Sequence, residues 1–260
     1  MGRRTRVSVV IPVKDDADRL AVCLAALARQ TEQPFEVVVV DNDSADDSAS
    51  VARARGARVV FEGRPGIPAA SSAGYDAATG DVIARLDADS IAPPHWLGSV
   101  RRAFDDSPEL GCLTGGATFS GGPAPLRRIG AALYLGAYYL ALAPALGHVP
   151  VFGSNFAMRR SVWQAIGPHV HRDDTELHDD LDLSFHLRPP VRVRYAGGLA
   201  VRISHRPLTD LGSLVTRFGR GFRTVAVHWP AELPWLRWAR ALRWGARGRR
   251  GPLRPRGSRG

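Results

Sequence analysis

The sequence is poor in cysteine and almost devoid of lysine. Its 260 residues include only two cysteines, Cys23 and Cys112, which are too few for a disulfide framework and lack the CxxC spacing of a zinc site. We interpret both as small apolar residues of the core. Lys14 is the single lysine among 35 basic residues, so the abundance of arginine carries little functional meaning by itself.

Long uninterrupted apolar segments are also lacking. Hydrophobic residues make up 45% of the chain and charged residues 23%, which excludes a disordered protein and one with many membrane spans. The apolar run at residues 7–13 is too short for a signal peptide, so we expect a cytoplasmic protein. Residues 129–146 are uncharged and long enough to span a membrane, but glycine and proline interrupt them, and we favour a buried or interfacial helix.

The net charge of +10 is confined to the C-terminal end. From Arg217 onward there are twelve arginines and one acid, Glu232, so this end carries +11 and the rest of the chain −1. Three tryptophans alternate with the arginines at near-helical spacing: Trp235, Trp238 and Trp244. The pattern would suit a nucleic acid backbone, but we favour an anionic membrane surface, with the protein peripheral on the inner face of the cell membrane.

Apolar runs and helical patterns alternate along the first ninety residues. Four predicted strands are separated by three predicted helices: strands at 7–13, 35–40, 58–61 and 81–86, and helices at 19–30, 46–55 and 67–79. Continuous apolar strands of this kind are typical of a parallel sheet that is buried on both faces. The alternation predicts an α/β fold, a doubly wound, mostly parallel sheet flanked by helices, with ligands beyond the carboxyl ends of the strands.

The second half is less regular, and its composition changes near residue 210. We predict helices at 94–104, 161–166 and 179–187, and strands at 110–119, 191–195 and 199–203. After Pro207 the residues are mainly Arg, Trp, Gly and Pro. We therefore divide the chain into a domain over 1–210, a basic aromatic-rich helical extension over 211–247 and a disordered Arg-rich tail over 248–260.

Acidic residues follow the predicted strands. Asp87 and Asp89 come directly after the fourth strand, and two carboxylates at this spacing suit a hard divalent cation such as Mg²⁺ or Mn²⁺. Asp41 ends the second strand, and Asp15 follows the first. Each of these acids is equally compatible with a solvated turn or a helix cap, so alone none of them establishes a site.

Five segments in order strengthen the functional interpretation. They are VSVVIPVKDDADRLAVCLAALARQ, FEVVVVDNDSADDS, GDVIARLDADS, VFGSNFAMRRSVWQAIG and HDDLDLSFHLR. Together, over residues 6–206, they resemble the family 2 glycosyltransferases. The resemblance implies the GT-A fold, a nucleotide-diphosphate sugar as donor, and Mg²⁺ or Mn²⁺ as cofactor.

The same resemblance assigns residues to the nucleotide. Pro12 ends the first strand and leads to Asp15 at the nucleotide base, and Asp41 binds the nucleoside. The family normally has an Arg-Asn pair where this chain has Ser71 and Ser72, and that arginine often contacts the nucleotide. Arg64 is a candidate replacement, and Lys14 is a candidate contact to a phosphate as a point charge.

The resemblance also assigns the metal and the catalytic base. Asp87 and Asp89 take the metal and the diphosphate, with His205 after the closing strand as a further metal ligand. Asp180 is the catalytic base, which removes the proton from the acceptor hydroxyl. We interpret its neighbours Asp179 and Asp182 as stabilising a helix N-terminus.

Two nearby loops remain open to more than one interpretation. The loop HVHRDDTELH contains His169, His171 and His178, and we favour a mobile acceptor loop over a metal site. The turn Gly153–Ser154–Asn155, which we expect to follow an apolar strand, either contacts the sugar or acceptor or is an ordinary turn.

We therefore expect a metal-dependent, inverting and non-processive glycosyltransferase with a hydroxyl acceptor, which a lipid-linked or cell-envelope molecule would supply. A sugar-phosphate nucleotidylyltransferase is the alternative enzyme, but no glycine-rich phosphate loop opens the chain. The alternative without catalysis is a basic binding protein whose nucleotide site is degenerate at Ser71 and Ser72.

Overall fold

The structure is a computed structural model that describes residues 4–120, 136–204 and 211–249. In chain order, its elements are β1 (Val7–Val13), α1 (Ala17–Ala28), β2 (Glu36–Asp41), α2 (Ser48–Ala54), β3 (Arg58–Phe61), α3 (Ile67–Ala77), β4 (Val82–Leu86), α4 (Trp96–Asp105), β5 (Leu110–Phe119), β6 (Asn155–Arg159), α6 (Arg160–Ile166), the 3-10 helix η1 (Gly167–His169), α7 (Asp179–His186), β7 (Arg192–Ile203), α9 (Leu211–His228) and α10 (Pro234–Arg249).

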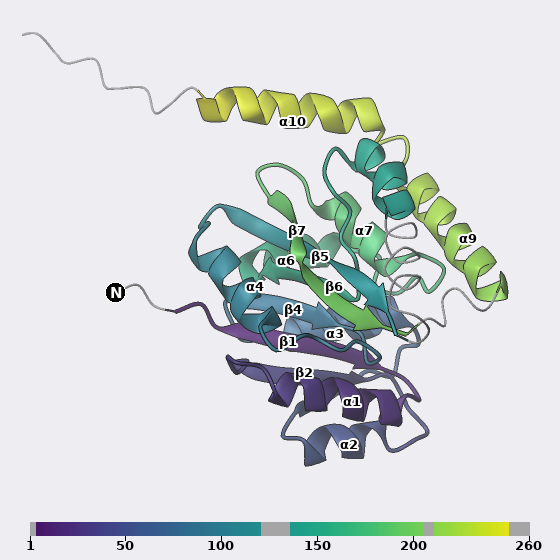
Figure 1. Cartoon of the computed structure of the whole chain (residues 1–260). Helices are drawn as coiled ribbons and strands as arrows, with labels where there is room; N and C mark the ends of the chain where they lie inside the picture. Colours follow the sequence, from purple (N-terminus) through teal and green to yellow (C-terminus); the bar gives the residue numbers. More distant parts are fainter. Residues whose placement is uncertain (1–3, 121–135, 205–210, 250–260) are drawn as a thin grey trace, which may run out of the picture.

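A seven-stranded mixed sheet with the order β3-β2-β1-β4-β6-β5-β7 forms the centre of the molecule (Figure 1). Strands β1 to β4 are mutually parallel, and β6 runs antiparallel to its neighbours β4 and β5. Side chains alternate across β1, so that Val9 packs in the cluster with α1 and α4 while Val10 packs in the cluster with α3 and α6. The predicted α/β architecture, a mostly parallel sheet between helices, is confirmed.

Two predictions about the second half were wrong in detail. The strands expected at 191–195 and 199–203 are one strand, β7, because its pairing with β5 continues across a register shift after Gly115 that absorbs residues 197–199, which include two glycines. The described residues directly before Gly153, 147–152, do not form a strand; the strand follows Gly153, as β6, because Asn155 pairs opposite Leu86 of β4.

The strand directions bring several chain segments to one edge of the sheet. The carboxyl ends of β1, β2 and β4 meet there, and the antiparallel strand β6 begins there. Each crossover therefore returns a loop to the same side of the molecule, which is the side where ligands of such sheets bind.

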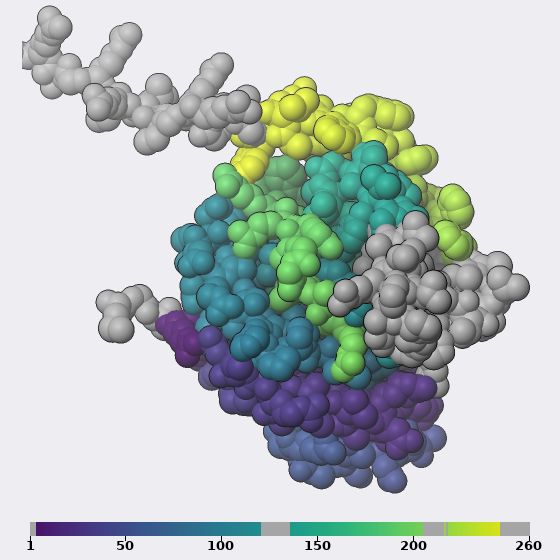
Figure 2. Space-filling model, viewed as in Figure 1, coloured from purple at the N-terminus to yellow at the C-terminus, as the bar shows by residue number. Residues whose placement is uncertain are grey.

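The C-terminal extension folds back onto this body. Helix α9 lies beside α7, and α10 extends across one end of the molecule (Figures 1 and 2). Arg237 of α10 is buried, and its guanidinium donates to the carbonyl oxygens of Leu146 (2.6 Å) and Phe185 (2.8 Å) and to the carboxylate of Glu232 (2.8 Å). These bonds fix α10 to the end of α7.

Residues 136–146 of the uncharged segment are helical, and residues 129–135 lie outside the described ranges. None of the helices in the described part of the chain combines the length and the hydropathy that a membrane span requires. Helix α10 continues to Arg249, and residues 250–260 of the predicted tail are likewise outside the described ranges.

Candidate functional site at the carboxyl edge of the sheet

The two acids after β4 lie beside the end of β7. The Ser90 N–H donates to the Asp87 carbonyl oxygen (2.9 Å) and closes a tight turn, and the Ser204 N–H donates to the Asp89 carboxylate. An isolated bridge between Ile91 and Arg202 holds the turn against β7. The predicted ligand His205 lies outside the described residues.

Arg85, which the sequence analysis overlooked, connects this turn to α7. It lies in the buried strand β4 with 3% of its surface exposed, and its guanidinium contacts Asp87 (2.9 Å) and Asp179. The Ser154 hydroxyl donates to the other oxygen of Asp87 (2.5 Å). A charge inside the apolar run VIARL was the available clue, because a buried arginine requires acidic partners. Asp179 is therefore an ion-pair partner and more than a helix-end acid.

Asp180 is buried at the start of α7. Its carboxylate accepts a hydrogen bond from the Gly153 N–H (2.7 Å) and contacts His178 Nδ1 (2.6 Å). Burial raises the pKa of Asp180, but His178, the Gly153 N–H and Arg85 together outweigh burial and hold this pKa below its ordinary value. The carboxylate is thus ionised, as a general base must be.

The acids after β1 and β2 organise the loops around them. Asp41 accepts a hydrogen bond from the Ser44 N–H (3.2 Å), and Asp15, at a left-handed φ of 49°, accepts one from the Ala45 N–H (2.7 Å). The Lys14 ammonium donates to the carbonyl oxygens of Asn42 (3.0 Å) and Asp43 (2.9 Å). Lys14 thus stabilises the loop after β2.

The family resemblance relates four further residues to the nucleotide. Pro12 is a β1 residue paired opposite Val40. Arg64 is exposed and pairs with Glu62 and Asp173, while Ser71 and Ser72 are buried in α3. The candidate replacement for the missing family arginine therefore lies in a loop already neutralised by two acids.

The carboxylates at this edge fit a divalent cation. Burial, and then the charges of Asp87 and Asp16, raise the pKa of Asp89 to about 6. The side chains that raise it supply carboxylate oxygens, the ligands that Mg²⁺ and Mn²⁺ prefer. A bound cation would relieve this repulsion.

A cavity of about 500 Å³ lies away from these acids, between the start of β7 and α10. Its lining includes Arg188, Arg192, Arg237 and Trp244 but no residue of the acidic edge. Because its acids Glu109 and Glu232 are ion-paired with Arg192 and Arg237, we assign the chemistry to the edge of the sheet and not to this cavity.

Comparison with known sequences agrees with this geometry. The family model described as Glycosyl transferase family 2 matches residues 8–167. An uncharacterized glycosyltransferase of Mycobacterium tuberculosis is 43% identical over 83 residues, which cover 32% of this chain and 36% of that protein. The undecaprenyl-phosphate 4-deoxy-4-formamido-L-arabinose transferase of Pseudomonas fluorescens is 38% identical over 101 residues, covering 35% of this chain and 30% of that one. The matched part is thus about a third of each relative.

Solved structures share the fold. Glucosyl-3-phosphoglycerate synthase from Mycobacterium tuberculosis, in complex with Mn²⁺, UDP and glucosyl-3-phosphoglycerate, has a TM-score of 0.55 at 20% identity. The similarity covers 83% of this chain and 80% of that one. This likeness supports the GT-A architecture.

The raised pKa of Asp89 predicts a pH-dependent effect on stability in metal-free protein. In the native state Asp89 keeps its proton up to about pH 6, whereas in the unfolded chain it loses the proton at its ordinary, lower pKa. The neutral side chain therefore stabilises the native state at low pH, and this stabilisation is lost as the pH rises through 6. Asp89→Asn cannot ionise, so it should match the wild type at pH 4 and exceed its free energy of unfolding by about 2 kcal/mol at pH 8.

Urea denaturation in the presence of EDTA at both pH values measures the difference. Asp106→Asn, at an exposed acid beyond α4, is the control and should show no such change. Equal stabilities of Asp89→Asn and wild type at pH 8 would contradict the crowding of carboxylates at this edge.

Proposed function

This chain belongs to glycosyl transferase family 2, and from that premise we propose that it transfers a sugar, with inversion, from a nucleotide-diphosphate donor to a hydroxyl acceptor. The observation that carries the proposal is the bridge from Asp87 through Arg85 to Asp179. It joins the acids that suit a metal-bound diphosphate to the helix that presents an ionised carboxylate, so donor and base belong to one rigid arrangement.

Asp87 and Asp89 are the residues that would hold Mg²⁺ or Mn²⁺. When bound, the cation supplies positive charge that stabilises the leaving diphosphate. Ser154 and Arg85 orient Asp87, and the Ser204 N–H orients Asp89. The related fold that was solved with Mn²⁺ and UDP supports the choice of a divalent cation.

Asp180 would accept the proton of the acceptor hydroxyl. Its position is fixed by the Gly153 N–H, and its ionised form is favoured by His178. His178 is partly exposed, with 27% of its side chain accessible, so it connects the buried carboxylate to the solvent side. Inversion requires a base that activates the acceptor on the face opposite the leaving group, and we assign this role to Asp180.

Nucleoside recognition would fall to the ends of β1 and β2. Asp41 and Asp15 lie there, and Pro12 shapes the end of β1. Lys14 contributes by holding the loop after β2 in place.

The metal role of Asp89 predicts a loss of coupled binding in Asp89→Asn. UDP with Mn²⁺ should raise the melting temperature of the wild type more than UDP alone, because a ligand that binds the native state stabilises it. The variant should lose the Mn²⁺-dependent part and keep its fold. A thermal-shift panel of UDP, GDP and dTDP sugars, with and without Mn²⁺, measures this loss and identifies the nucleotide of the donor. An equal Mn²⁺-dependent shift in Asp89→Asn would remove Asp89 from the site.

The base role of Asp180 predicts a defect in turnover and not in donor binding. Asp180→Asn keeps the shape of the side chain and removes the proton acceptor, so kcat should fall by ~10²–10⁴-fold. Release of the nucleoside diphosphate with a permissive acceptor, together with a donor titration, separates the two effects. If more than a tenth of the activity remains, another group is the base, and Asp179 is the next candidate.

We further propose that the extension contacts an anionic membrane, where a polyprenyl-linked acceptor would be found. Trp235, Trp238 and Leu242 are 65%, 48% and 70% exposed and share one face of α10 at i, i+3 and i+7. Phe218 and Phe222 are exposed on α9. The polyprenyl lipid undecaprenyl-phosphate in the name of the Pseudomonas fluorescens relative supports the choice of a membrane surface.

Serine at Trp235, Trp238 and Leu242 should abolish sedimentation with anionic liposomes, because the aromatic face supplies the insertion. Arg237 remains in this variant, since its buried bonds hold α10 in place. A control places serine at Val22 of α1 and Phe61 of β3, which are also exposed hydrophobic residues but lie outside the extension. Binding should also weaken at about 1 M salt, where screening is strong. Unchanged sedimentation of the triple variant would argue against membrane contact through α10.

A further inference from the structure

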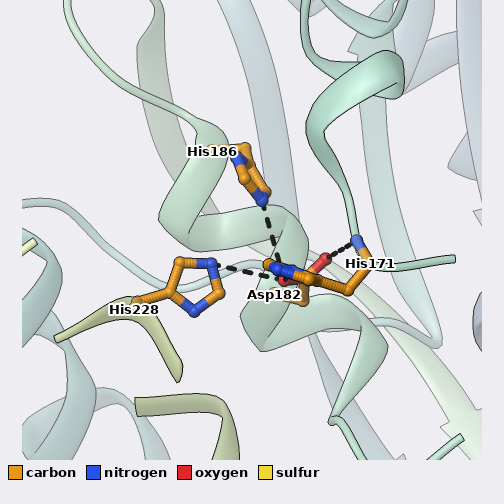
Figure 3. A group of neighbouring side chains, drawn as sticks. All are labelled: His171, Asp182, His186 and His228. Carbon is orange, nitrogen blue, oxygen red and sulfur yellow. Dashed lines mark hydrogen bonds and ion pairs between the residues drawn. The ribbon is translucent and has the colours of Figure 1, made fainter. Parts of the chain in front are cut away.

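Three histidines and an aspartate from separate segments converge outside the acidic edge (Figure 3). His171 comes from the loop after η1, Asp182 and His186 from α7, and His228 from the last turn of α9. Asp182 Oδ1 lies 2.7 Å from His171 Nδ1, 3.3 Å from His228 Nε2 and 3.7 Å from His186 Nε2. One oxygen is therefore surrounded by three ring nitrogens.

The hydrogen bonds of His228 orient a lone pair toward this oxygen. His228 Nδ1 lies 2.8 Å from the Thr224 carbonyl oxygen, which can only accept, so Nδ1 carries the hydrogen. In the neutral ring Nε2 is then a bare acceptor facing the carboxylate. The Nε2 atoms of His228 and His186 are both buried and make no hydrogen bond to the described residues. With 4% of its side chain exposed, His228 is shielded from bulk solvent.

We propose that His171, Asp182, His186 and His228 bind one Zn²⁺-like transition-metal ion. A cation between the nitrogens and the oxygen satisfies every facing lone pair at once. Ligands about 2.0–2.1 Å from a tetrahedral metal lie about 3.3–3.4 Å from one another, and the three distances from Asp182 bracket that value. Imidazole nitrogens favour Zn²⁺ over Mg²⁺ and Mn²⁺, so this site differs chemically from the carboxylates after β4.

Hydrogen bonds around the cluster resemble those that orient the ligands of known protein metal sites. The Thr224 carbonyl fixes the tautomer of His228, and the His171 N–H donates to the second oxygen of Asp182 (2.9 Å). Such outer partners orient metal ligands. Asp182 and His186 are four residues apart and lie on the same face of α7.

With four protein ligands the site is closed, and its role would be structural. It would fasten α9 to α7, the helix that begins with Asp179 and Asp180. The Thr224 hydroxyl already accepts from the His178 N–H (2.9 Å), so α9 also reaches the histidine that contacts Asp180. Metal binding would therefore stabilise the position of Asp180, the proposed base, through α9 and His178.

The test measures metal without substrate, so it is independent of the proposed transferase activity. Full-length protein is stripped with a chelator, dialysed against Zn²⁺ and analysed for bound metal, and Co²⁺ is added to a second sample for its visible spectrum. We expect one Zn²⁺ per chain, a melting temperature that rises with Zn²⁺, and the intense bands of tetrahedral Co²⁺.

His186→Ala and His228→Gln should weaken Zn²⁺ binding by more than the roughly 10–100-fold that loss of an outer partner costs. His169→Ala, a histidine of η1 outside the cluster, and Asp89→Asn should keep the full zinc content. Should the buried variants fail to fold, His171→Ala at the exposed margin tests the same prediction, since 40% of that side chain is accessible. Absence of bound zinc, or zinc content unchanged in these variants, would overturn the proposal and indicate a proton in place of the metal.

Discussion

The contact of buried Arg85 with Asp87 and Asp179 is the interaction on which the rest of the site depends. A guanidinium inside a central strand has lost its hydration, so it must be neutralised by nearby acids, and removing a partner of such a pair costs about 3–5 kcal/mol. Here the partners come from the turn after β4 and from the first residue of α7. Neutralisation of one buried charge thus holds the turn after β4 close to the start of α7.

The same electrostatics explains why neighbouring acids differ. Asp180 gains His178 and a backbone N–H and stays ionised, whereas burial and the charges of Asp87 and Asp16 raise the pKa of Asp89. Asp180 is therefore ionised at a lower pH than Asp89. Two carboxylates of equal chemistry acquire different pKa values because their surroundings differ.

The C-terminal extension contains both buried and exposed side chains. Arg237 points inward to carbonyl groups at the end of α7, while Trp235 and Trp238 remain exposed on the same helix. The sequence pattern grouped Arg237 with the surface charge, but its side chain holds α10 against the end of α7. The exposed aromatic face is what supports the proposed membrane contact.

The sequence by itself determined the α/β alternation and the acids at strand ends, because strand burial and loop position leave local patterns in the chain. Family 2 membership also followed from the sequence. Tertiary structure decided which acids acquire partners: the contact of Arg85 with Asp179 spans 94 residues, and His228 reaches Asp182 from another helix. The continuity of β7 also depended on its partner strand, since pairing with β5 carries it across two glycines. Contacts between distant residues arise only when the sheet and α9 are in place, and no local pattern records them.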